Sequence, residues 1–147
     1  MFNNREDIYC ERVYSPWTDL DPILRENKIP LFTLETQEPV KNFDFLGITL
    51  QYEMCYTNVL QILDLSQIPL HTCDRTENDP IVIWGRALRL QSGAAGRFFD
   101  LFYIGEGETV YFELMDRYKE NKKGRRHQKA VLGKGGRDTG HLCAGFL

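Results

Sequence analysis

The stretch FDFLGITLQYE, residues 43–53, decides the fold. Few of its positions are polar, and the apolar ones are Phe45, Leu46, Ile48, Leu50 and Tyr52. Near-continuous apolar runs are typical of strands that are covered on both faces, as in parallel sheets. The sequence therefore predicts a buried strand here, belonging to a parallel sheet.

Two later segments have helical character. YTNVLQILDLSQIP (56–69) repeats its apolar residues at helical spacing, with Thr57 or Asn58 as the cap and Pro69 as the end. ETVYFELMDRYKENKKG (108–124) begins with acids and ends with lysines, as the helix dipole prefers. We predict a helix from each segment.

Two further strands are expected between these helices. TENDPIVIWG (76–85) is predicted to be a turn followed by a buried strand, and FFDLFYIGEGE (98–108) a strand that ends in glycines. Strands that alternate with helices favour a parallel α/β sheet with right-handed crossovers. Residues 87–96 between the two strands supply no clear helix for such a crossover.

The first third of the chain is less regular. Leu20–Asn27 is predicted to make two helical turns, Ile29–Glu35 a short strand, and Thr36–Asn42 a loop or a weak helix. Nothing that resembles a first strand with its own helix precedes these elements.

Composition indicates an ordinary soluble domain. The chain has 147 residues, 42% hydrophobic and 27% charged, which suits one domain. A net charge of -3 gives no attraction to nucleic acid, and no apolar run approaches the roughly 20 residues that span a bilayer. The basic, glycine-rich residues after Gly124 are either a nucleic-acid contact or a disordered end, and we favour the latter. The charged N-terminus does not resemble a signal peptide, so a cytoplasmic protein is expected.

The four cysteines are scattered, without CxxC spacing. We therefore expect neither disulfides nor a structural metal site built from this chain alone. No Ser/His/Asp or Cys/His arrangement predicts a catalytic residue.

In open parallel sheets, ligands bind beyond the carboxyl ends of the strands. Glycine there lets a ligand approach the backbone, and helix N-termini offer free N–H groups. The sequence predicts a cofactor-binding rim made of Tyr52, Glu53, Tyr56, Thr57, Asn58, Gly85, Gly105, Glu106 and Gly107. The alternative is that these glycines only make turns and that the acids near them only favour a helix start.

Three motifs resemble those of one family: residues 10–70, DPIVIWG (79–85) and FFDLFYIGEGE (98–108). Together they resemble the N-terminal cobalamin-binding-type domain of a class of radical S-adenosylmethionine (SAM) proteins, over Cys10 to about Lys123. That domain is a flavodoxin-like variant of the Rossmann fold, in agreement with the alternation of strands and helices.

The resemblance implies that the parent is a cobalamin-dependent radical SAM enzyme and that this chain is its partial, cofactor-cradling domain. In that class a CxxxCxxC loop holds a [4Fe–4S] cluster that cleaves SAM, and no cysteine here matches the loop. The DxHxxG motif, by which some cobalamin domains supply an axial histidine, is also absent. The chain alone is therefore not expected to be catalytic, and its implied partners are cobalamin and the radical SAM domain.

We expect residues 1–124 to form a partial cobalamin-binding-type domain that lacks its first βα unit. Residues 125–147 are expected to be a linker or a disordered tail, and the radical SAM core to be absent from this chain. Two alternatives stay open: a non-catalytic α/β module that docks a partner, and a non-functional gene fragment.

The resemblance also offers an explanation for ALRLQSGAAG, residues 87–96. The family has a loop of the type Gly-Gly-Pro-Cys-Ala-Tyr-Asn-Pro at this place. Codons can be chosen for Ala87–Gly96 so that a shift of one base encodes that loop, and Asp138–Leu147 can be treated in the same way. We infer a frame-damaged fragment, a hypothesis that the coding DNA tests.

Overall fold

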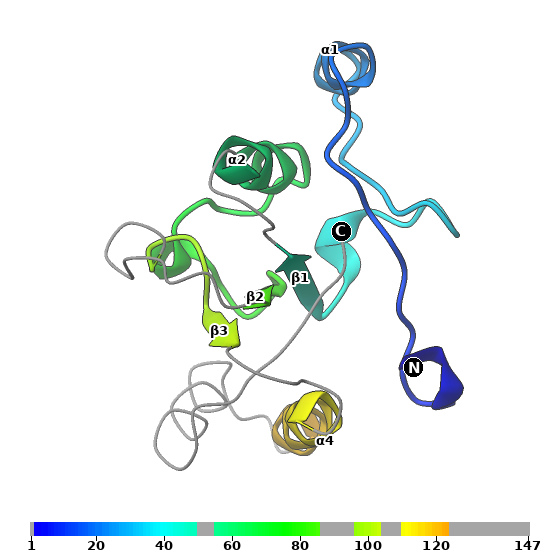
Figure 1. Ribbon diagram of the computed structural model, residues 1–147, viewed down its shortest axis with the longest axis vertical. Coiled ribbons are helices and arrows are strands. Elements are labelled where there is room, and N and C mark those ends of the chain that lie inside the picture. The colour runs from blue at the N-terminus through cyan, green and yellow to red at the C-terminus, as the bar shows by residue number, and fades with distance from the viewer. Residues whose placement is uncertain (1, 50–54, 86–95, 104–109, 124–147) are drawn as a thin grey trace.

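The computed structural model describes residues 2–49, 55–85, 96–103 and 110–123. These residues form a three-stranded parallel sheet in the order β1-β2-β3 (Figure 1). The strands are β1 (Phe45–Thr49), β2 (Ile81–Gly85) and β3 (Leu101–Tyr103). The α-helices are α1 (Leu20–Glu26), α2 (Tyr56–Leu65) and α4 (Val110–Lys123), and the 3-10 helices are η1 (Phe2–Asn4), η2 (Val40–Asn42) and η4 (Thr72–Asp74). The predicted parallel α/β sheet, Rossmann- or flavodoxin-like and incomplete, is confirmed.

The sheet lies between α2 on one face and α4 on the other (Figure 1). Successive side chains of a strand point to opposite faces, so each strand contributes to both layers. On the α2 face the core contains Leu46, Ile48, Val82 and Trp84 with Val59, Ile62 and Leu63 of the helix. On the α4 face it contains Ile81, Ile83 and Leu114, with Phe45, Leu101, Tyr111 and Tyr118 packed against them. The near-continuous apolar runs therefore mark strands covered on both sides.

Two of the helices end in the same way, with a non-glycine residue in the left-handed region. In α2 the φ of Gln67 is 57°, and Ile68 N–H donates to Leu63 C=O at 2.9 Å. In α1 the φ of Lys28 is 54°, and Ile29 N–H donates to Leu24 C=O at 2.9 Å. These bonds form the Schellman closure, which satisfies carbonyl groups at a helix end. Helix α2 therefore ends before Pro69, and the prediction that Pro69 ends it is wrong.

Two other predictions are corrected. Ile29–Glu35 is not a strand, because its only sheet-like pairing is an isolated antiparallel bridge between Phe32 and Pro39. The chain turns back on itself there, with a φ of 61° at Gln37. The N-cap of α2 is Cys55, whose side chain makes no capping bond, so neither Thr57 nor Asn58 is the cap.

A buried ion pair ties the segment before β2 to the start of β3. Arg75 and Asp100 are 2.8 Å apart, and their side chains are only 2% and 6% exposed. Arg75 also donates to the carbonyl groups of Pro69, Leu70 and Phe98. Asp100 accepts a further bond from the backbone N–H of Val82 at 2.8 Å.

The predicted change of reading frame concerns residues 87–96 and 138–147. Apart from Gly96, these lie outside the residues that the structure describes, so the frame hypothesis stays a prediction. Among the described helices, none is both long enough and apolar enough to cross a membrane.

Candidate functional site

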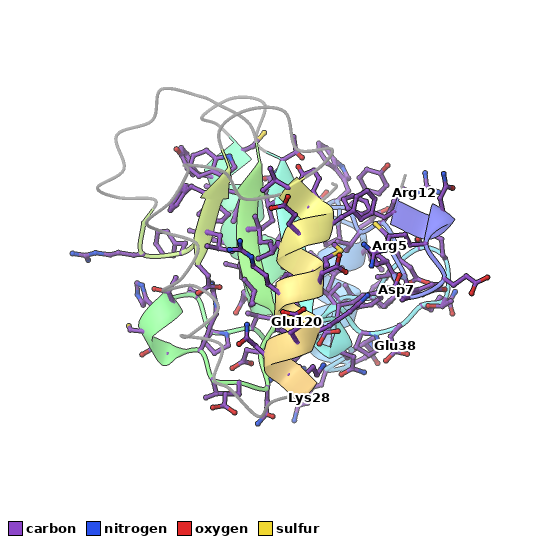
Figure 2. The ribbon with its side chains drawn as sticks, turned by 90° about the horizontal axis from the view of Figure 1, so that it is seen from below. Arg5, Asp7, Arg12, Lys28, Glu38 and Glu120 are labelled. Carbon is purple, nitrogen blue, oxygen red and sulfur yellow. The ribbon has the colours of Figure 1, made fainter. Side chains whose placement is uncertain are left out.

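The predicted rim is partly visible at the carboxyl ends of the strands, the upper edge of the sheet in Figure 2. Gly85 ends β2, and Tyr56, Thr57 and Asn58 open α2, which follows β1 in the chain. Because β1 and β2 are parallel neighbours, their carboxyl ends lie at the same edge. The other predicted rim residues, Tyr52, Glu53, Gly105, Glu106 and Gly107, lie outside the described residues.

The N-terminus of α2 has the features of an acceptor-binding end. Cys55 provides no side-chain cap, and the first turn contains no acid. The first backbone N–H groups of a helix have no partner within the helix and carry partial positive charge. Thr57 and Asn58 are exposed beside them, and Tyr56 is half-buried. This end of the helix suits an oxygen acceptor such as an amide or a phosphate.

Trp84 lies directly beneath this edge, one residue before Gly85. It is 4% exposed, and its indole Nε1 is buried without a hydrogen-bond partner among the described residues. Its ring contacts Tyr56 edge-on at 6.0 Å, and Phe99 and Phe102 at 5.1 and 5.5 Å. A buried indole N–H usually finds an acceptor, so the acceptor of this one is to be sought outside the described residues.

Trp84 is absent from the predicted rim. The available signal was its position, since it is the last side chain of β2 before the glycine at the carboxyl end. Its burial hid this signal, because an aromatic residue in an apolar run is expected to be core.

The described residues bring no histidine to this edge. His71 precedes η4 and stacks on Phe98 with 5.4 Å between ring centroids. Its neighbour Thr72 donates to the carbonyl of Arg97, which precedes β3, so this loop lies at the amino ends of the strands. In the described part of the chain, no group of three His, Cys, Asp or Glu residues is arranged to hold a metal ion.

A hollow that the sequence did not predict runs along the outer edge of β1. We call it the edge cleft. It has a volume of about 730 Å³ and lies between β1, helix α4 and the N-terminal segment, residues 2–13. Its β1 wall includes Phe45, Leu46 and Gly47, and its α4 wall includes Met115, Tyr118, Lys119 and Lys122.

The N-terminal segment is held beside α4 by charge and by aromatic packing. Arg5 forms a bidentate salt bridge with Asp116: its two guanidinium nitrogens lie 3.2 and 2.6 Å from the two carboxylate oxygens. Asp7 accepts from Arg5 at 2.7 Å and from Lys119 at 2.5 Å. The buried Phe2 packs against α4 through Tyr111, with 5.3 Å between ring centroids. Figure 2 shows Arg5 and Asp7 beside the helix.

Three ionisable groups that line the edge cleft have shifted pKa values. Burial, and then a hydrogen bond to Asp44, raise the pKa of Tyr118 above its ordinary value. Burial acts to raise the pKa of Glu11, but hydrogen bonds from the hydroxyls of nearby Thr and Tyr side chains outweigh it and lower the pKa. Hydrogen bonds from Arg5 and then Lys119 hold the pKa of Asp7 well below its usual range.

Comparison with known proteins gives one family and one distant relative. The family model described as "Radical SAM proteins, N-terminal" matches residues 1–139. An uncharacterized protein of Methanocaldococcus jannaschii is 31% identical over 98 residues, which is 63% of this chain and 20% of that protein. The chain therefore spans about a fifth of the length of the curated relative it matches. No solved structure matches.

Proposed function

The chain belongs to the family of N-terminal domains of radical SAM proteins, and on this premise we propose that it holds cobalamin at the carboxyl edge of its sheet. The cofactor would then face a catalytic domain that contains a [4Fe–4S] cluster and SAM in the intact parent. Cobalamin supplies a redox-active cobalt that can carry an alkyl group. We also propose that the protein is cytoplasmic.

One observation carries this proposal: among the described residues, the buried indole N–H of Trp84 has no acceptor, and it lies at the edge where α2 begins without a side-chain cap. The corrin ring of cobalamin bears many amide side chains, whose carbonyl oxygens are acceptors for an indole N–H. Gly85, which has no Cβ, allows a large planar ligand to approach the end of β2. In this arrangement Tyr56, Thr57 and Asn58 would surround the amide groups.

In this proposal the described residues would contact the amide groups of cobalamin and would offer no histidine to its cobalt. The only histidine among them, His71, lies in the loop at the amino ends of the strands. The sequence also lacks the DxHxxG motif. We therefore propose that this chain would bind cobalamin without a histidine on its cobalt.

Titration with hydroxocobalamin tests the proposal. We expect the corrin absorption bands to change and the corrin to co-elute with the protein on gel filtration. Trp84→Phe keeps an aromatic ring but removes the N–H, so it should weaken binding about 2- to 12-fold, the worth of one hydrogen bond. Trp17→Phe is the matched control, because Trp17 is 79% exposed. Absence of binding by the wild-type chain would refute the proposal.

A second candidate function is a docking module without a corrin. Three large apolar residues of α1 and the segment before it are exposed: Tyr14 at 51%, Trp17 at 79% and Ile23 at 52%. Exposed apolar surface of this kind often marks an interface. In this case the chain should associate with a separately expressed radical SAM domain, and Ile23→Asp should weaken that association. A pull-down that recovers no radical SAM domain would refute this second candidate function.

A further inference from the structure

At the outer edge of β1, the backbone groups of Phe45 and Gly47 have no partner among the described residues. In a parallel pair, alternate residues of a strand bond to the same neighbour. Ile81 N–H donates to Asp44 C=O at 3.0 Å, so Asp44, Leu46 and Ile48 face β2. Phe45 and Gly47 must then point their N–H and C=O groups outward, into the edge cleft. No partner for these groups exists among the described residues.

Gly47 makes this open edge unusual. It is buried although its backbone groups point away from the sheet. More than about 90% of buried backbone groups in native proteins are hydrogen-bonded, because an unpaired one costs free energy. A solvent-exposed edge strand avoids this cost by bonding to water. The buried position of Gly47 therefore indicates a site for a hydrogen-bonding partner.

The edge cleft is large enough to hold a short additional strand. From the rise per residue, the strand spacing and the thickness of a sheet layer, one strand residue occupies about 160 Å³. The volume of about 730 Å³ thus accommodates roughly four or five residues, close to the five residues of β1. The cleft has walls on both sides of the sheet plane, Val13 and Val40 on the α2 side and Met115 and Tyr118 on the α4 side.

The charges that line the cleft are partly compensated. Lys119 pairs with Asp7, and Lys122 pairs with Asp44. Glu11 and Glu38 also line the cleft, and neither has an ion-pair partner in the part of the chain that the structure describes. A segment with apolar residues at its centre and a basic residue at its end would complement this lining.

We propose that the edge cleft binds an extended, apolar polypeptide segment with a basic flank, which adds to β1 as a further strand. Such a strand would bond to Phe45 and Gly47 through its backbone and fill the cleft with its side chains, the recognition mode called β-augmentation. A second copy of the whole chain fits less well, because the N-terminal segment lies on the β1 side of the molecule, across the cleft from the strand, and would obstruct the approach of a whole domain (Figure 1). The binding edge differs from the carboxyl edge, so this inference and the cobalamin proposal can fail separately.

The test uses the full chain and a fluorescein-labelled peptide, Lys-Ala-Val-Ile-Val-Ala-Lys. Backbone hydrogen exchange is followed by NMR with and without saturating peptide. We expect the amides of Phe45 and Gly47 to exchange at least about tenfold more slowly with peptide, while the amides of Leu46 and Ile48, already bonded to β2, change little. No binding, or binding that leaves the Phe45 and Gly47 amides unchanged, overturns the proposal.

Two alternately N-methylated forms of the peptide provide the control. Alternate residues of a strand point their N–H groups to opposite edges, so each form has the N–H groups of one peptide edge blocked. Only one of the two peptide edges can pair with β1. We expect one form to bind like the parent peptide and the other to lose at least about tenfold in affinity, the scale of one or two hydrogen bonds. Equal affinities would contradict strand addition. If the same amides become protected when the protein concentration is raised without peptide, the edge serves self-association instead.

Discussion

Arg75 and Asp100 form an ion pair whose side chains are 2% and 6% exposed and whose closest atoms are 2.8 Å apart. Arg75 also donates to three carbonyl groups, and Asp100 accepts a bond from Val82 N–H. This cluster joins the segment after α2 to the beginning of β3. It therefore sets the position of the third strand against the second.

Removal of the arginine should be strongly destabilising. Arg75→Met leaves Asp100 buried without its cation, for which we expect a loss of about 3–5 kcal/mol in the free energy of unfolding. Urea denaturation followed by circular dichroism measures this loss. Arg12→Met is the control, because its pair with Glu35 is exposed and should contribute about 0–1 kcal/mol. Similar losses for both variants would contradict the structural role of the buried pair.

Glycine at the end of α2 should stabilise the protein. Gln67 has a φ of 57°, a region that costs a residue with a Cβ about 1–2 kcal/mol. Gln67→Gly removes this cost and keeps the backbone bonds of the closure, and part of the gain is lost to the entropy of the unfolded chain. We expect a net stabilisation of about 1 kcal/mol, seen as a higher melting temperature. Glu120→Gly, in the interior of α4, should instead destabilise by about 1 kcal/mol.

The N-terminal segment should detach from α4 in acid. The pKa of Asp7 is lowered by hydrogen bonds from Arg5 and then Lys119, and the pKa of Asp116 by its hydrogen bond from Arg5. A lowered folded-state pKa means that the attachment is present above the ordinary carboxyl pKa of about 4 and is lost as the pH falls through the folded-state value. NMR signals of the Phe2 ring should report the release. Asp116→Asn should weaken the attachment at neutral pH, whereas Glu120→Gln on the same helix should not.

Alkaline pH should destabilise the protein through Tyr118, which lies on the α4 wall of the edge cleft. Burial and then the hydrogen bond to Asp44 raise the pKa of Tyr118. A raised folded-state pKa means that the contribution to stability is complete below the ordinary tyrosine value of about 10 and is lost as the pH rises through the folded-state value. The melting temperature should therefore fall above about pH 10, and Tyr118→Phe should reduce this fall. Tyr14→Phe, at an exposed position, should leave it unchanged.

The sheet could be predicted from the sequence because strands covered on both faces leave a near-continuous apolar run. The same argument failed for Ile29–Glu35, since an apolar run also occurs where a turn packs on the core. There the backbone N–H of Val40 donates a hydrogen bond to the carbonyl of Leu31, and both residues are buried. The described residues form no continuous β-ladder at this place.

The carboxyl edge of the sheet and the edge cleft were predictable to different degrees. The carboxyl edge follows from topology alone, so Gly85 and the start of α2 could be placed in advance. The edge cleft depends on contacts between distant parts of the chain, such as Arg5 with Asp116, which are 111 positions apart. No local pattern encodes such a contact.

The pairing of Arg5 with Asp116 has a consequence for biosynthesis. A ribosome releases residues 2–13 before their binding surface on α4, since Asp116 follows Arg5 by 111 positions. The N-terminal segment must therefore remain unattached until α4 has been made. Contacts of such long sequence separation slow folding, so closure of this layer is expected to be a late event that follows assembly of the sheet.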